Sequence, residues 1–222
     1  MEKGKISVRR ELREPDAFVK TTYTVIDYVK KHSKLFIAGT VLLIVVVITA
    51  VGTSWYLNDR RVKAEQALNQ VLANLEKESA ETAQLLSRIR TEYRSTPVGP
   101  LAGYLEANLE YRQDKLDQAA KLYRENQVSD RYLEDLQRYS LAVIDYRQGK
   151  YDSAISILED LQTRQSFINE DTYILLGLSY EKNNNLQKAV AVYENMIQLL
   201  PRSFFRPWAE ERLASLKYRL KS

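Results

Sequence analysis

An uncharged apolar run of 23 residues lies near the start of the chain, at residues 35–57 (LFIAGTVLLIVVVITAVGTSWYL), bracketed by Lys34 and Asp59. As a helix it reaches about 34 Å, and the hydrocarbon core of a bilayer is about 30 Å thick. Trp55 and Tyr56 at its end are typical of a membrane–water interface. We therefore expect one transmembrane helix near the N-terminus.

This run is expected to be a retained anchor and not a cleaved signal peptide. A cleavable signal has an apolar stretch of about 7–15 residues followed by a small-residue site, and neither feature is present here. Four Lys residues flank the run on its N-terminal side, and three Lys/Arg flank it on the other. This four-to-three bias favours residues 1–34 in the cytoplasm and residues 58–222 outside it.

The segment before the run predicts a further helix. Pro15 stands where a first helical turn could begin, and apolar residues then recur on one helical face. These residues are Phe18, Thr22, Val25, Ile26 and Val29. The helix is expected either to lie on the membrane as an amphipathic helix or to be an ordinary solvated juxtamembrane helix.

Charge and composition exclude several classes of function. Residues 1–34 carry a net charge of +4, which equals the net charge of the whole chain, so residues 58–222 are neutral overall. The basic isoelectric point therefore does not indicate nucleic-acid binding. The absence of cysteine excludes thiol catalysis, disulfides and thiolate metal sites.

The C-terminal part repeats with a constant offset of 35 residues. The matching phrases are RQDKLDQAAKLY (112–123), RQGKYDSAISIL (147–158) and KNNNLQKAVAVY (182–193), with Ala119, Ala154 and Ala189 in one column. Such a period indicates stacked helical hairpins, each with a tight turn at 113–114, 148–149 or 183–184. We expect an all-α solenoid with units at about 60–97, 100–134, 135–169 and 170–203. A cap helix is expected at 204–221. A turn is expected at EKESAE (76–81), inside the unit at 60–97.

The unit at 170–203 resembles the tetratricopeptide repeat (TPR), whose pattern is W-x2-L-G-x2-Y…A-x3-F…P. It carries Tyr173, Leu176, Gly177, Tyr180, Ala189, Tyr193 and Pro201 in the corresponding order. The unit at 135–169 keeps much of the pattern but has Ala142 in place of the glycine, and the unit at 100–134 keeps less. Residues 60–95 fit only as a degenerate unit.

The order of parts is also similar to YfgM-like proteins, the ancillary subunits of the bacterial SecYEG translocon. The similarity covers a short head, one span, and repeats that include EYRSTPVGPLAGYLEANLEY (92–111). It implies a bacterial inner-membrane protein with a periplasmic TPR domain. It further implies partners in secretion, namely SecYEG and periplasmic chaperones or their clients, with contact to membrane lipid.

The TPR resemblance also implies a concave groove lined by fixed positions of the first helix of each unit. Tyrosine and arginine are enriched at binding hot spots, so we expect a partner-binding groove here. Its candidate residues are Tyr104, Tyr111, Arg112, Tyr139, Tyr146, Arg147, Leu178 and Lys182. The same positions also include Leu101, Asn108, Leu136, Val143, Asp171, Ile174 and Glu181. The alternative is that the tyrosines pack helix against helix.

No constellation of residues indicates an enzyme. His32 is the single histidine, no phosphate-binding glycine motif occurs, and paired carboxylates lie among polar helix faces. We therefore expect a non-enzymatic scaffold with no catalytic residue, metal or cofactor. The alternatives are a structural tether that self-associates and, if the topology is reversed, a TPR receptor that faces the cytosol.

Overall fold

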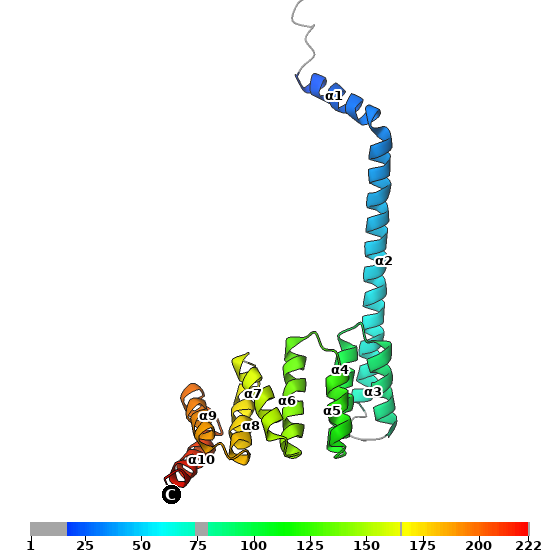
Figure 1. The fold of residues 1–222 in the computed structure, drawn as a ribbon. Helices are drawn as coiled ribbons and strands as arrows, with labels where there is room; N and C mark the ends of the chain where they lie inside the picture. The colour runs from blue at the N-terminus through cyan, green and yellow to red at the C-terminus, as the bar shows by residue number, and fades with distance from the viewer. Residues whose placement is uncertain (1–16, 74–79, 165, 222) are drawn as a thin grey trace, which may run out of the picture. The chain divides into compact units, whose positions relative to one another are not determined.

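The computed structural model describes residues 17–73, 80–164 and 166–221, and these residues form helices without strands (Figure 1). Residues 1–16 of the predicted head and residues 76–79 of the predicted turn lie outside this range. The helices are α1 (Ala17–Lys31), α2 (Ser33–Leu72), α3 (Ala80–Glu92), α4 (Val98–Arg112), α5 (Leu116–Glu125), α6 (Arg131–Arg147), α7 (Tyr151–Thr163), α8 (Asn169–Lys182), α9 (Leu186–Leu199) and α10 (Arg206–Arg219). The chain divides after Asn58 into two units.

The first unit contains α1 and the apolar part of α2. The backbone N–H of His32 still bonds to the carbonyl of Tyr28 at 3.0 Å, although the two helices separate at this residue. α2 is long and apolar enough to cross a membrane, and none of its apolar window is buried by protein. Its apolar side chains therefore have no protein core to pack in.

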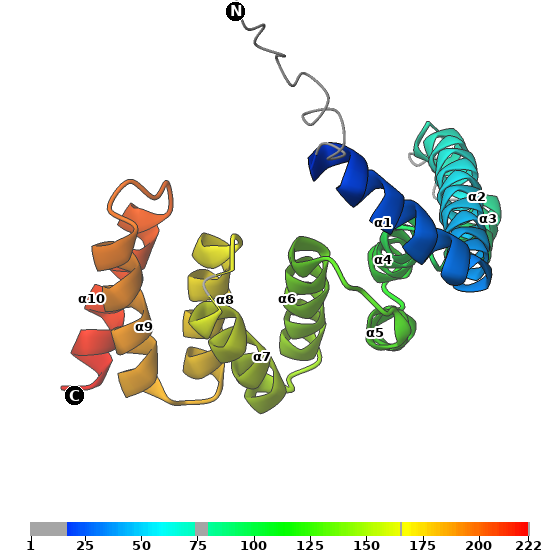
Figure 2. The ribbon, with the colours of Figure 1, turned by 90° about the horizontal axis from the view of Figure 1, so that it is seen from above.

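The second unit, residues 59–222, stacks short helices one after another. The last part of α2 packs with α3 in one apolar cluster. Then α4 pairs with α5, α6 with α7 and α8 with α9, while α10 packs on α9 (Figures 1 and 2). Each helix pair buries its apolar face against the next pair, as a repeat protein requires. The predicted all-α, TPR-like solenoid is confirmed.

The three predicted turns share one backbone conformation. Asp114, Gly149 and Asn184 occupy equivalent positions and have positive φ angles of 62°, 75° and 56°. Only glycine adopts this region without a steric penalty, and Asn and Asp tolerate it better than other residues. Each turn directly follows the last residue of a first helix, so it reverses the chain into the second helix.

Small residues allow the two helices of each hairpin to approach closely. Ala119, Ala154 and Ala189 are fully buried at the same position of α5, α7 and α9. At Gly177 an added Cβ would lie 2.4 Å from the ring of Tyr193, a fully buried residue. The helices α8 and α9 therefore lie in close contact at Gly177.

Neighbouring hairpins are joined by a repeated polar contact. The amide of Gln148 donates to Asp117 at 2.9 Å, and that of Asn183 donates to Asp152 at 2.6 Å. Both bonds connect residues 31 apart and differ from each other by one 35-residue repeat. The stacking therefore has the same register at both junctions.

Candidate functional site

A hollow of about 310 Å³ opens on the first helices of the first two complete hairpins and the start of α8. We call it the tyrosine hollow. Its lining residues are Tyr104, Asn108, Tyr111, Tyr123, Leu136, Tyr139, Ser140, Val143, Ile168 and Asp171. This volume is at the lower end of the range for ligand sites, which suits one or two side chains of a partner.

The inner end of the hollow is held by a pair of tyrosines. The rings of Tyr104 and Tyr123 lie 5.6 Å apart, and the Tyr123 hydroxyl donates to Asn108 Oδ1 at 2.7 Å. Burial raises the pKa of Tyr123, so its hydroxyl remains a proton donor. Tyr123 forms a fixed wall because it is buried and its hydroxyl is already bonded within the protein.

Tyr139 and Asp171 give the hollow its second wall. Burial, with a smaller effect of the nearby Asp171 carboxylate, raises the pKa of Tyr139 to about 12. Tyr139 is half-buried, while Asp171 is exposed at the rim. A ligand entering here would meet an uncharged phenol and one negative charge.

A cation lies against the ring of Tyr111, the fourth tyrosine of the hollow. The guanidinium of Arg147 lies 5.0 Å from the centre of the Tyr111 ring, and its Nη2 donates to Asp114 Oδ1 at 2.8 Å. Hydrogen bonding to Tyr111 and Asp114 raises the pKa of Arg147. The Arg147 side chain is thus held across two repeats, and part of its charge is already balanced.

Other predicted groove residues lie elsewhere. Tyr146 is half-buried and packs edge-on against Tyr151, with ring centres 5.6 Å apart. Arg112 and Lys182 are exposed and Leu178 is half-buried, and none of the three lines the hollow. Of the eight candidate residues, the structure brings Tyr104, Tyr111 and Tyr139 together in the hollow. Arg147 contacts it through Tyr111.

Three lining residues were outside the positions assigned to the groove: Tyr123, Ser140 and Ile168. Tyr123 comes from the second helix of its hairpin, whereas the sequence rule considered only first helices. The repeat did contain a signal, because Tyr123, Leu158 and Tyr193 share one column of large residues.

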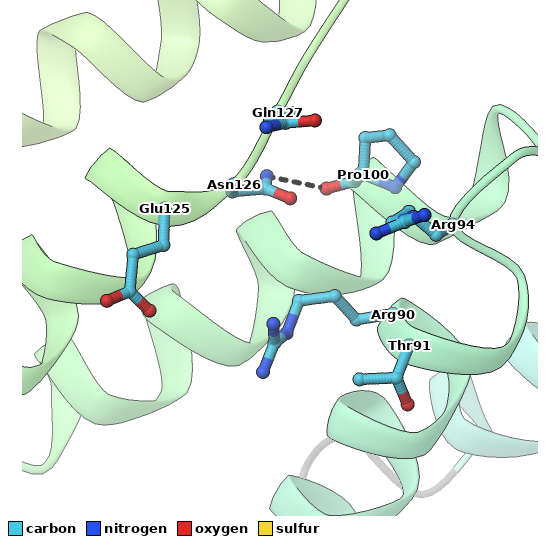
Figure 3. A pocket seen from close by; sticks show the side chains of 8 residues that line it. Arg90, Thr91, Arg94, Pro100, Glu125, Asn126 and Gln127 are labelled. Carbon is cyan, nitrogen blue, oxygen red and sulfur yellow. Dashed lines mark hydrogen bonds between the residues drawn. The ribbon is translucent and has the colours of Figure 1, made fainter.

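A second pocket, of about 280 Å³, lies between α3, α4 and the end of α5 (Figure 3). The amide of Asn126 donates to the carbonyl of Pro100 and to Gln137 Oε1, both at 2.9 Å. Arg90, on the wall, pairs with Glu106 at 2.7 Å. These polar groups bond to one another, so they act mainly as a packing network between hairpins.

The described part of the chain holds no group of three or more His, Asp or Glu side chains that could hold a metal ion. The tyrosine hollow instead combines aromatic and aliphatic walls with an amide, an exposed carboxylate and a guanidinium. Such a surface can bind a peptide segment through buried apolar contacts and oriented hydrogen bonds.

Comparisons with solved structures show the fold. A MamA RS-1 double mutant matches with a TM-score of 0.58 at 18% identity, covering 72% of this chain and 86% of that chain. MamA residues 41–end from Desulfovibrio magneticus RS-1 match at 0.55 and 16%, covering 70% and 94%. A candidate kinesin light chain with TPR-like repeats from Podosopora anserina matches at 0.52 and 16%, covering 70% and 84%.

No curated protein matches this chain. The model of the tetratricopeptide repeat-like domain family matches residues 27–218, which is most of the sequence. Proteins built from such repeats are generally non-enzymatic scaffolds that bind other proteins. The chain therefore belongs to the tetratricopeptide repeat-like domain family.

Proposed function

We propose that this protein is a membrane-anchored scaffold that binds a segment of a partner protein in the tyrosine hollow. The observation that carries the proposal is the convergence of Tyr104, Tyr111 and Tyr139, from two successive repeats, on one hollow. Rigid aromatic side chains bury large areas at a small entropic cost, which is why they dominate binding hot spots. α2 supplies the anchor.

Two opposite charges at the rim of the hollow would fix the direction in which the partner segment binds. Asp171 is exposed at one side, and Arg147 lies on Tyr111 at the other. A segment with an apolar side chain between a basic and an acidic group would match both charges. Its apolar side chain would contact Leu136 and Val143.

We place the scaffold in the bacterial inner membrane, with residues 58–222 in the periplasm. The four-to-three charge bias across the apolar run and the similarity to YfgM-like proteins support this orientation. Together they favour a role in secretion, in which the protein passes clients between the SecYEG translocon and periplasmic chaperones.

Site-specific photocrosslinking in intact cells tests the binding site. A photoreactive phenylalanine at Val143 should capture a discrete partner, whereas the same residue at Ser156, exposed on α7, should not. Asp171→Lys should remove the Val143 crosslink, while Glu211→Lys, an equal charge reversal on α10, should leave it unchanged. Partner capture at Ser156 alone would place the binding site outside the hollow. A Val143 crosslink that still forms in the Asp171→Lys variant would exclude the proposed binding direction of the segment.

A further inference from the structure

The connections between successive hairpins form one continuous edge of the repeat domain. We call residues 93–97, 126–132, 164, 166–168 and 200–206 the inter-repeat edge. The Asn126 amide bonds to the carbonyl of Pro100, the Arg131 guanidinium to the carbonyl of Arg164, and the Ser203 hydroxyl to Glu170. Three of the four connections are therefore bonded to a hairpin that they adjoin, and the α5–α6 connection is visible at one end of α6 in Figure 1.

Exposed aromatic side chains gather on this edge. Among described residues from 59 onward, four of the five exposed aromatic residues lie on it: Tyr132, Phe167, Phe204 and Phe205. Phe204 is 88% exposed, and the rings of Tyr132 and Phe167 are 5.3 Å apart. The opposite edge consists of the turns at 113–115, 148–150 and 183–185, which contain only Gln, Asp, Lys, Gly and Asn. All but one of these exposed aromatic residues therefore lie on the inter-repeat edge, whereas the turns of the opposite edge are polar.

The same edge carries positive charge. It contains five arginines and one aspartate, although residues 58–222 are neutral overall. Arg164 and Arg206 are bound to Glu134 and Glu210 at 3.0 and 2.8 Å. Arg94 and Arg202 are exposed and take part in none of the ion pairs of the described residues. Their charge is thus available to an anionic surface.

The start of the repeat domain contacts the edge at Tyr93. Asp59 follows the apolar run by one residue, and Arg60 donates to the carbonyl of Glu92 and lies 5.7 Å from the Tyr93 ring. The first residues after the run therefore contact the start of the edge.

We propose that the inter-repeat edge binds the surface of a bilayer that carries anionic phosphate headgroups. Phe167 and Phe204 enter the interface, where aromatic side chains are favoured, and Arg94 and Arg202 contact phosphates. The proposal rests on the membrane anchoring of the proposed function. Docking of this edge would hold the solenoid against the membrane and leave the opposite edge in solution.

The absence of native cysteine allows a direct test on the full chain. Phe204→Cys and the control Gln187→Cys, which is exposed next to the turn at 183–185, each receive one small fluorophore. Both variants are reconstituted in vesicles of phosphatidylcholine with or without phosphatidylglycerol, containing a lipid with a headgroup nitroxide quencher. The label at 204 should be quenched, more strongly with phosphatidylglycerol, while the label at 187 should not.

A second variant tests the charge argument. One arginine near an anionic surface strengthens association about fivefold, so Arg94→Gln with Arg202→Gln should lower the docked-to-undocked ratio about 25-fold. Quenching that is equal at 204 and 187, or absent from both while the protein floats with the vesicles, would overturn the proposal. Protein that fails to float would instead refute the anchor. A label at 204 that is shielded in native membranes but unquenched in vesicles would assign the edge to a protein contact and overturn the lipid proposal.

Discussion

Replacement of Gly177 by alanine should destabilise the C-terminal repeat, although alanine is the better helix former. The new Cβ would lie 2.4 Å from Cε1 and Cζ of Tyr193 and 2.8 Å from its hydroxyl. Tyr193 cannot move freely, because it is fully buried, bonds to Glu181 at 2.8 Å and packs 5.5 Å from Trp208. The substitution should therefore displace the ring and break its hydrogen bond.

The magnitude follows from three effects. Alanine gains about 0.5–1 kcal/mol over glycine inside a helix. Overpacking costs about 1–3 kcal/mol, and loss of a hydrogen bond to a carboxylate costs about 1.5–3 kcal/mol. The net loss of unfolding free energy is then about 1.5–5.5 kcal/mol. A loss of about 3 kcal/mol lowers the Tm of a domain this size by about 6–12 °C.

The measurement is thermal unfolding of the full chain in detergent micelles, followed by helical circular dichroism and by the fluorescence of Trp208 in a Trp55→Phe background. Ser156→Ala, at an exposed position, serves as the matched control. Adding Tyr193→Leu to Gly177→Ala should recover the packing loss, because the second repeat already pairs Ala142 with Leu158 at these positions. A Tm that stays constant or rises for Gly177→Ala would refute the reasoning.

Three further outcomes are expected. Ala189→Leu, at a fully buried position, should lower the unfolding free energy by about 1–3 kcal/mol in urea titrations. Gly149→Ala should cost about 1–2 kcal/mol in the same titrations because φ is 75° there, whereas Asn184→Gly should cost nothing. Hydrogen bonding to Arg164 lowers the pKa of Glu134 from 4.5, so the stability that Glu134 contributes is present above pH 4.5 and is lost as the pH falls through the lowered value; Glu134→Gln should flatten this acid dependence in melts between pH 7 and pH 3.

The hairpins and their turns could be predicted because their causes are local and repeated. A 35-residue period places a small residue at 119, 154 and 189, and all three are buried in the same way. The turn residues Asp114, Gly149 and Asn184 are types that tolerate a positive φ. No long-range information is needed to recognise either feature.

The detailed content of the hollow depends on contacts between repeats, which spacing alone does not specify. Arg147 was expected to be a partner-binding residue of the groove. In the structure it binds Asp114, 33 residues earlier, and lies on Tyr111. A residue type that recurs at one repeat position shows on which helix face the side chain lies. It does not show which residue the side chain contacts, because that residue stands at a different repeat position.

Glu181 shows why the hollow does not continue along the whole solenoid. It stands in the column of Tyr111 and Tyr146. In the third repeat this carboxylate is nearly buried, accepts a hydrogen bond from Tyr193 and pairs with Arg212 of α10, whose Nε is 3.1 Å away. Where two earlier repeats carry tyrosine, the third therefore uses the position to fasten the cap helix. The exchange of an aromatic side chain for a carboxylate ends the tyrosine row and anchors the C-terminal helix by the same substitution.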